Sequence, residues 1–307
     1  MQNCCKGLCL LLACLLLAAC TPQEASAPPP ITFTDSAGHT VTLTDTPTRV
    51  AVLFSSLADI WVSAGGSVAV TVGETVERGI VPAEDVILVD GGAGKAIDTE
   101  QLIAAAPELV ICSADVPAQS EVAALLRTAD IPVAECRVES FADYLAVLQQ
   151  FTAITRRPDL YAASGTEQAA RIEDIRASRP FAGKRILFIR AGSSARSVKA
   201  KPSSDHFAAT MLAELGAVNI ADNAPLLLDS LSMEVILRED PDYIFFTAMG
   251  DENASRQYVE EMLQQETWRA LTAVQTGRWR YLPKELFHYK PCARWAEAYA
   301  YLAALAV

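Results

Sequence analysis

Short β-rich runs alternate with amphipathic helical stretches almost to the end of this chain. This order indicates an α/β protein with mainly parallel sheets, because each parallel strand needs a crossover helix to bring the chain back. Two such series can be separated. Strands are expected at residues 50–53, 69–72, 86–89, 109–112 and 133–136 in the first series, and at 184–189, 218–220, 243–247 and 279–281 in the second.

A helix-forming stretch lies between the two series, over residues 159–179, with Pro158 at its entry and no internal proline. Its composition predicts one long helix. The expected fold is therefore two Rossmann-like lobes bridged by this helix. The expected boundaries are 31–157 for the N-terminal lobe, 158–180 for the bridging helix and 181–307 for the C-terminal lobe. Bending such a helix breaks backbone hydrogen bonds, so we expect only small lobe motions.

The N-terminus carries a secretion signal. An apolar run over residues 8–19 follows Lys6 and ends in Leu-Ala-Ala-Cys at Cys20, which resembles the bacterial lipoprotein cleavage box. The run is too short for the ~20 apolar residues that a membrane-spanning helix needs. We expect a signal peptide at 1–19, a lipid on Cys20 and a flexible tether over 20–30, which anchor an extracytoplasmic protein to the cell membrane. An ordinary cleaved signal near a cysteine is the alternative.

Cysteine content and charge exclude two classes of protein. Only Cys112, Cys136 and Cys292 follow Cys20, which is too few for a disulfide scaffold. A disulfide between Cys112 and Cys136 is one possibility, and buried packing thiols are the favoured one. The formal net charge of −12 argues against a nucleic-acid partner, because such proteins need a basic surface.

One sequence pattern occurs twice, once in each half. Residues 98–111 read DTEQLIAAAPELVI and residues 232–245 read SMEVILREDPDYIF. Each predicts a short helix that is stopped by proline before an apolar strand. Two copies predict two similar lobes.

These repeats, an opening Asp-x-x-Gly hairpin with Gly38, and an aromatic and cationic segment at 286–295 occur in a characteristic order. Together they resemble the periplasmic-type binding proteins for ferric siderophores, haem and cobalamin, whose two lobes are joined by one long helix. The resemblance covers residues 31–307. It implies a monomeric solute-binding component of an ABC importer, with no catalytic residues and no cofactor, which delivers a metal chelate to a permease dimer and its ATPase.

The resemblance also implies a docking role for two glutamates, Glu100 and Glu234, which occupy matching places in the two repeats. In the family, such glutamates dock into arginine pockets on the two membrane subunits, and separated carboxylates can steer a two-fold partner. Each glutamate also favours the positive end of its helix dipole, and both roles can hold together.

Ligand-binding residues are expected in the loops at the carboxyl ends of the strands. Residues 190–201 concentrate positive charge, which suits an anionic chelate, although a solvated basic loop is the alternative. Haem ligation by His288 or Tyr289 is a weaker interpretation, so no metal site is assigned. The candidates are Ser55, Ser56, Lys95, Arg190, Arg196, Lys199, His288, Tyr289 and Arg294.

A siderophore is the favoured ligand, with haem or a corrinoid as alternatives. A zinc or manganese receptor is a remote alternative, because the three histidines are scattered along the chain. A hydrolase or ATPase is also remote. The Gly-rich run that ends at Lys95 fails the phosphate-loop pattern, since Val89 occupies the first glycine position and Ala96 follows the lysine.

Overall fold

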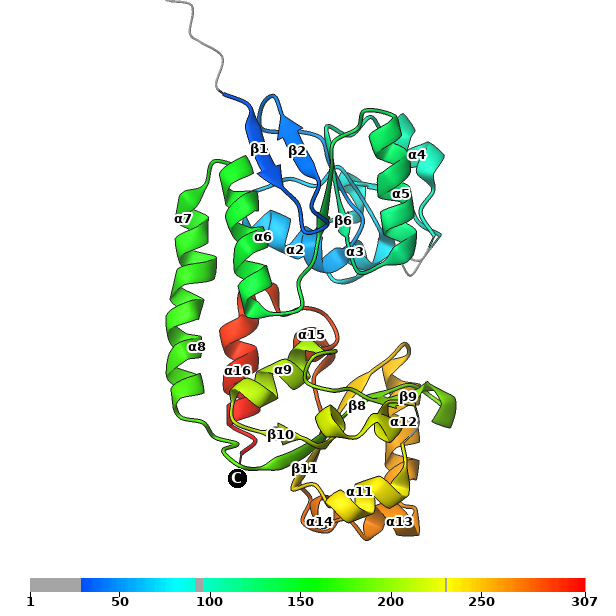
Figure 1. The fold of residues 1–307 in the computed structure, drawn as a ribbon. Helices are drawn as coiled ribbons and strands as arrows, with labels where there is room; N and C mark the ends of the chain where they lie inside the picture. The colour runs from blue at the N-terminus through cyan, green and yellow to red at the C-terminus, as the bar shows by residue number, and fades with distance from the viewer. Residues whose placement is uncertain (1–28, 92–95, 230, 307) are drawn as a thin grey trace, which may run out of the picture. The chain divides into compact units, whose positions relative to one another are not determined.

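A five-stranded parallel sheet forms the centre of the N-terminal lobe, in the order β5-β4-β3-β6-β7 (Figure 1). The computed structural model describes residues 29–91, 96–229 and 231–306. The strands are β3 (Val50–Val52), β4 (Val70–Thr71), β5 (Ile87–Leu88), β6 (Leu109–Ser113) and β7 (Val133–Cys136). The helices are α2 (Ser55–Ser63), α3 (Gly73–Glu77), α4 (Thr99–Ala104), α5 (Pro117–Thr128) and α6 (Phe141–Ile154).

The C-terminal lobe repeats this plan with four parallel strands in the order β10-β8-β11-β12. The strands are β8 (Arg185–Ala191), β10 (Val218–Asn219), β11 (Tyr243–Ala248) and β12 (Trp279–Tyr281). The helices are α9 (Phe207–Glu214), α10 (Pro225–Asp229), α11 (Met233–Glu239), α12 (Glu252–Leu263), α13 (Glu266–Arg269), α14 (Thr272–Gln275), α15 (Lys284–Phe287) and α16 (Trp295–Ala303). The predicted two-lobed α/β fold is confirmed.

One strand of the C-terminal lobe was not predicted. Where the sequence indicated a basic loop, the chain makes a short 3-10 turn and returns as β9 (Val198–Ala200), antiparallel to β8. Lys199 lies opposite Arg190 in this pairing. Opposed residues of paired strands point to the same face of a sheet. The basic segment is therefore ordered by backbone hydrogen bonds.

The bridging segment is helical throughout but not uniform. α7 (Pro158–Tyr161) and α8 (Glu167–Ala177) are joined by a π-helical turn at Ala162–Thr166. A Cβ atom on Gly165 in this turn would lie 3.0 Å from Leu145 Cδ2 of α6. The glycine thus lets the bridge approach α6 closely. α16 packs along α8 on the same side of the molecule (Figure 1).

One hydrophobic cluster, with residues from both lobes, runs through the joint between them. Trp295, at the start of α16, is completely buried in it. Its ring centroid lies 5.9 Å from that of Phe141 on α6 and 5.8 Å from that of Phe207 on α9. Helices from both lobes therefore pack on one side chain, and relative motion of the lobes would open a gap in a close-packed interior.

The two helix–Pro–strand repeats adopt matching structures. Ala106 and Asp240, the residues before the prolines, are both left-handed, with φ of 48° and 35°. The next backbone contact is also shared, because Glu108 N donates to Arg49 O at 2.8 Å and Asp242 N donates to Arg185 O at 2.8 Å.

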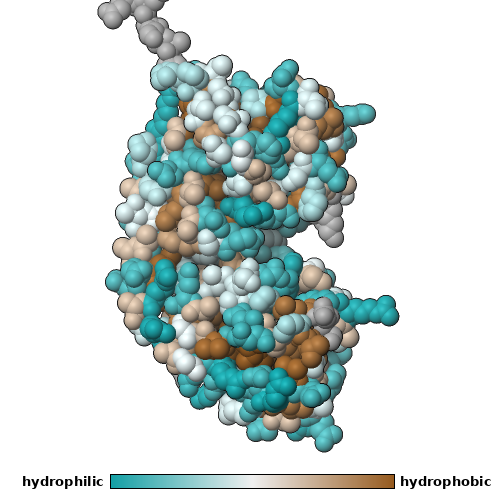
Figure 2. Space-filling view, viewed as in Figure 1, coloured by the Kyte–Doolittle hydropathy of each residue, from teal (hydrophilic) through white to brown (hydrophobic). Residues whose placement is uncertain are grey.

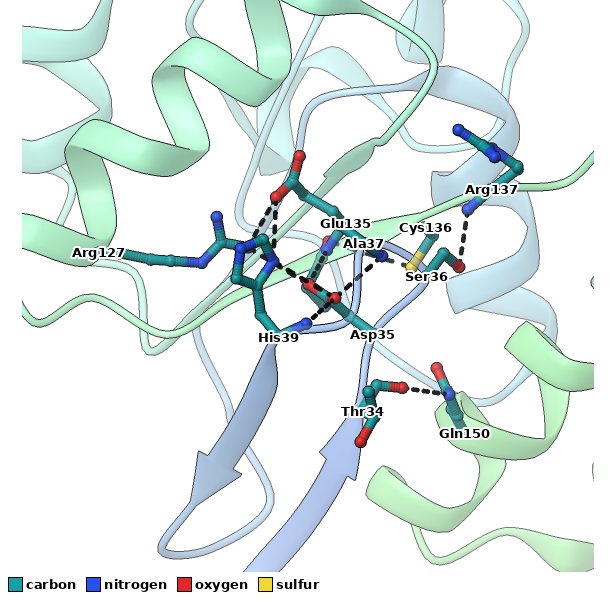
Figure 3. Close-up of polar contacts among 11 residues, drawn as sticks. Thr34, Asp35, Ser36, Ala37, His39, Arg127, Glu135, Cys136, Arg137 and Gln150 are labelled. Carbon is teal, nitrogen blue, oxygen red and sulfur yellow. Dashed lines mark hydrogen bonds and ion pairs between the residues drawn. The ribbon is translucent and has the colours of Figure 1, made fainter.

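The predicted opening hairpin is present as β1 (Ile31–Thr34) and β2 (Thr40–Leu43), with Gly38 at φ 88° in the turn. A buried polar cluster fixes this turn to the end of β7 (Figure 3). Asp35 Oδ2 accepts from the backbone N–H of Glu135 at 3.0 Å. Arg127 Nη2 lies 3.3 Å from the Asp35 carboxylate and 2.8 Å from that of Glu135, so one guanidinium joins two buried acids.

Cys112, Cys136 and Cys292 are free and buried. Burial in apolar surroundings raises the pKa of the Cys112 thiol to about 12 and also raises those of Cys136 and Cys292. The interpretation of these cysteines as packing thiols is confirmed.

We expect Arg127→Met to lower the free energy of unfolding by about 3 kcal/mol, because it leaves two buried carboxylates facing each other without a cation. Urea denaturation at pH 7 measures this change. Arg156→Met is the control, since the exposed pair of Arg156 with Asp45 at 3.1 Å should contribute less than about 1 kcal/mol. Equal losses in the two variants would contradict a special role for Arg127.

Candidate ligand-binding cleft

A pocket lies between the lobes, where the carboxyl ends of β3, β6, β7 and β8 meet. Figure 2 shows the surface hollowed between the two lobes, on the side away from the bridging segment. The pocket has a cavity volume of about 190 Å³. This volume is below the ~300–1,000 Å³ that is usual for small-molecule sites. Its position agrees with the general rule for ligands of parallel α/β sheets.

The carboxylates that line this pocket are already paired with cations. The pairs are Asp115 with Arg137 at 2.7 Å, Asp205 with Lys201 at 2.6 Å, and Glu139 with Lys290 at 2.6 Å. Arg190, at the end of β8, also lines the pocket, and it makes no ion pair with any other residue that the structure describes. The pocket therefore carries an uncompensated positive charge, which favours an anionic ligand.

His288 lines the pocket and is oriented by the end of β11. Its Nδ1 lies 2.8 Å from the carbonyl oxygen of Ala248. A carbonyl can only accept, so Nδ1 carries the proton and Nε2 has a free lone pair in the neutral ring. Burial lowers the pKa of His288, and the charges of Arg190 and Lys284 lower it further. A metal-ligating histidine commonly has this arrangement, in which a backbone carbonyl holds the second nitrogen.

His206 lies at the same pocket in the opposite tautomer. Its Nδ1 accepts from Ala208 N at 3.2 Å and so caps the first turn of α9, which leaves Nε2–H as a donor. Burial depresses the pKa of His206 well below its ordinary value, and the charges of Lys290, Arg190 and Lys201 add to this effect. The histidines are scattered along the sequence, yet the fold brings two of them to one pocket.

The structure divides the predicted ligand-binding residues. Ser56, Arg190 and His288 line the pocket. Tyr289 and Arg294 line a second, more polar cavity of about 520 Å³ instead. Ser55 is buried, whereas Arg196 in the β8–β9 turn and Lys199 on β9 are exposed. Lys95 and the predicted lipidation site Cys20 lie outside the described residues.

Arg78 was not among the predicted ligand-binding residues. It contacts three of them, Ser55, Ser56 and Tyr289. Arg78 Nη1 donates to Ser55 Oγ at 3.0 Å and to Ser56 Oγ at 3.3 Å. Its guanidinium also lies 4.3 Å from the ring centroid of Tyr289. Arg78 therefore ties α2 of the N-terminal lobe to the loop before α16. We name these contacts the Arg78 clamp.

One group of described residues, Asp35, His39 and Glu135, brings potential metal ligands within 4.8 Å of one another. Arg127 already supplies positive charge to both carboxylates, and His39 Nδ1 lies 3.5 Å from each of them. A cation would have to compete with this guanidinium. We therefore interpret the group as the attachment of the hairpin. No helix among the described residues is long and apolar enough to cross a membrane.

The family model described as "Periplasmic binding protein" matches residues 50–286, and the chain belongs to this family. The resemblance that the paired helix–Pro–strand repeats indicated is thus confirmed. Membership implies a substrate-binding role in transport rather than catalysis, and an extracytoplasmic location. No match is found among curated proteins.

Solved structures of binding proteins share the fold at low sequence identity. The siderophore binding protein BauB, bound to a complex between two molecules of acinetobactin and ferric iron, has a TM-score of 0.71 at 15% identity, covering 90% of this chain and 98% of its own. The vitamin B12 binding protein BtuF of Vibrio cholerae has a TM-score of 0.68 at 17% identity, with coverages of 85% and 97%. The apo haem-binding protein RhuT of Roseiflexus sp. RS-1 has a TM-score of 0.66 at 18% identity, with coverages of 84% and 97%.

The two cleft histidines should make stability depend on pH. Their pKa values are lowered in the folded protein, so the unfolded chain takes up protons first as pH falls below about 6.5. The free energy of unfolding should therefore fall between pH 7 and pH 5. His206→Asn keeps a capping acceptor but does not titrate, so its decline should be shallower, by at most ~1.4 kcal/mol per pH unit. Urea denaturation at several pH values measures both slopes, and identical slopes would show that His206 is protonated in the folded state.

Proposed function

We propose that this protein is the solute-binding component of an ABC importer, and that it captures an iron chelate, with a siderophore favoured, and delivers it to the membrane permease. The observation that carries the proposal is the pocket between two joined lobes, in which Arg190 has no carboxylate partner among the described residues. The likeness to a ferric siderophore binding protein supports the same ligand class.

Charge complementarity favours a ferric siderophore. Ferric complexes of carboxylate or catecholate chelators are anionic. The guanidinium of Arg190 can donate two parallel hydrogen bonds to the oxygen atoms of such a chelate. The Nε2–H of His206 adds a neutral donor to the same pocket. Each lining carboxylate has its own cation, so the pocket presents no uncompensated negative charge to repel such a ligand.

Haem or a corrinoid is the second candidate, and one observation favours it. His288 Nε2 is a free acceptor on a ring that a backbone carbonyl orients, which suits axial ligation of a macrocycle metal. Tyr289, the other candidate ligand, lies against Arg78 and lines the second cavity rather than this pocket.

Absorption spectroscopy of the protein purified from its native host, combined with elemental analysis, tests the proposal. Broad visible absorption with bound iron indicates a ferric chelate, a Soret band indicates haem, and corrin bands indicate a cobalamin relative. Bound zinc or manganese without a chromophore would overturn all three assignments.

Lipid anchoring is a further part of the proposal. The short apolar run that ends in Leu-Ala-Ala-Cys at Cys20 supports cleavage before this cysteine and acylation of its thiol. Mass spectrometry of the mature N-terminus distinguishes a lipidated Cys20 from an ordinary signal-peptidase product.

Docking through Glu100 and Glu234 completes the proposed delivery. Both side chains are exposed in the first turns of α4 and α11, and neither makes a hydrogen bond or ion pair with another described residue. The cap of α4 comes from Asp98 instead, which accepts from Gln101 N at 2.9 Å. The Glu100 carboxylate is therefore not used as a cap, and it remains available to a partner while it lies at the positive end of the helix dipole.

We expect Glu100→Ala and Glu234→Ala to leave the melting temperature and ligand affinity unchanged while iron uptake by the host falls. The double variant should be worst, because each missing carboxylate leaves a basic pocket unpaired, at a cost of about 2–5 kcal/mol. Uptake of ⁵⁵Fe under iron limitation measures the effect. Glu121→Ala and Glu260→Ala, exposed glutamates of α5 and α12, are matched controls. Normal uptake by the folded double variant would end the docking assignment.

Arg190→Ala should weaken binding of an anionic ferric chelate by about 1.5–3 kcal/mol, the usual contribution of a charged hydrogen bond. Titration calorimetry with the chelate that copurifies with the protein measures this loss. Arg196→Ala is the control, because Arg196 is exposed and does not line the pocket. Equal affinities in the two variants would place the ligand elsewhere.

A further inference from the structure

One ion pair at the pocket joins the two lobes. Lys290, in the loop before α16, donates from Nζ to Glu139 Oε1 at 2.6 Å, and Glu139 lies between β7 and α6 of the N-terminal lobe. Both of these side chains line the pocket. In the other two pairs the carboxylates of Asp115 and Asp205 line the pocket, but their cations do not. Release of Glu139 would therefore leave a free cation at the pocket wall, which release of either aspartate would not.

The two partners of this pair are held very differently. The Lys290 side chain is 16% exposed, its Nζ lies 4.8 Å from the ring centroid of Phe207, and its backbone N–H donates to Ser56 Oγ at 3.3 Å. A cation over an aromatic face is stabilised in that position. The Glu139 side chain is 46% exposed and makes no other hydrogen bond or ion pair with a described residue. The carboxylate can therefore move into water while the ammonium group stays in place.

Lys290 and Arg190 act on the same part of the pocket. Both residues line it. Burial lowers the pKa of His206, and the positive charges of Lys290 and Arg190 lower it further, so both cations lie near one imidazole ring. A ligand with one anionic group could pair with only one of these cations. A chelate with two or more anionic oxygen groups could pair with both.

The size of the pocket also favours movement of Glu139 when a ligand binds. At about 190 Å³ the cavity is smaller than the sites that usually hold small molecules. Glu139 forms part of the cavity wall, so its departure enlarges the space. A large shift of the lobes is opposed by the close packing around Trp295. Movement of one half-exposed side chain is the less costly way to admit a ligand.

We propose that Glu139 is an internal substitute for an anionic group of the ligand. Before a ligand binds, Glu139 pairs with Lys290, and an anionic chelate then displaces it and binds Lys290 and Arg190 together. This inference rests on the proposed solute-binding function, and it narrows the ligand to a chelate with at least two anionic oxygen groups. Lys290 is thereby a ligand-binding residue. Glu139 lowers the apparent affinity, because only the molecules in which Lys290 is free are ready to bind.

Titration calorimetry with ferric dicitrate, an anionic carboxylate chelate, tests this exchange. We expect Glu139→Gln to bind ferric dicitrate about tenfold more tightly, as removal of a competitor that occupies Lys290 in about nine of ten molecules requires. Lys290→Met should bind it about tenfold more weakly, because a charged hydrogen bond is lost. In the Lys290→Met background, Glu139→Gln should have no effect. Glu121→Gln, at an exposed position of α5, is the control for loss of a surface charge.

Three results would overturn the exchange: unchanged affinity in Glu139→Gln, tightening that persists without Lys290, or equal tightening in Glu121→Gln. Failure of every variant to bind ferric dicitrate at millimolar concentration would overturn the anionic class of ligand. Thermal melting separates the exchange from a structural role of the ion pair. Glu139→Gln should melt at a lower temperature yet bind more tightly, whereas a structural role predicts weaker binding in the less stable variant.

Iron-free citrate tests the iron assignment separately. If it binds as tightly as ferric dicitrate and responds to the same substitutions, the exchange at Lys290 stands and the iron chelate is rejected. If ferric dicitrate alone binds but does not respond to Glu139→Gln, the iron chelate stands and the exchange is rejected.

Discussion

Packing of Trp295 between α6 and α9 is the constraint on which the two-lobed arrangement depends. It joins apolar side chains of both lobes into one hydrophobic cluster, and the Arg78 clamp adds a polar connection to the same loop. A joint of this kind holds the cleft largely in its final geometry. Binding then costs little reorganisation, and Arg190 and the two cleft histidines are already positioned before a ligand arrives.

The fold was largely predictable because its determinants are local. Alternating apolar runs, the proline stops and the glycine turn act over a few residues each, and they place the parallel strands and the opening hairpin. β9 and the π-helical turn at Ala162–Thr166 were not predictable in this way. The first depends on pairing with β8, and the second on how closely Gly165 approaches Leu145 of α6.

The candidate site was predictable only to the level of loops. The rule that ligands bind at the carboxyl ends of parallel strands correctly predicted Ser56, Arg190 and His288 as residues that line the pocket. The same reasoning also selected Ser55 and Tyr289, whose polar and aromatic groups contact Arg78 instead. Arg78 lies at the end of a five-residue helix with no motif around it, so no local pattern assigns it these partners. Likewise, His206 follows a strand that the sequence did not reveal.

The late position of Trp295 in the chain also constrains the order of folding. Phe141 and Tyr144 on α6 pack against this side chain, which is synthesised more than a hundred residues after them. A chain that emerges from its N-terminus can pair the strands of its first sheet early, but the apolar face of α6 stays uncovered until α16 arrives. Completion of the first lobe is thereby postponed to the last step, and any chain that ends before α16 presents the unprotected apolar surfaces that chaperones and proteases recognise.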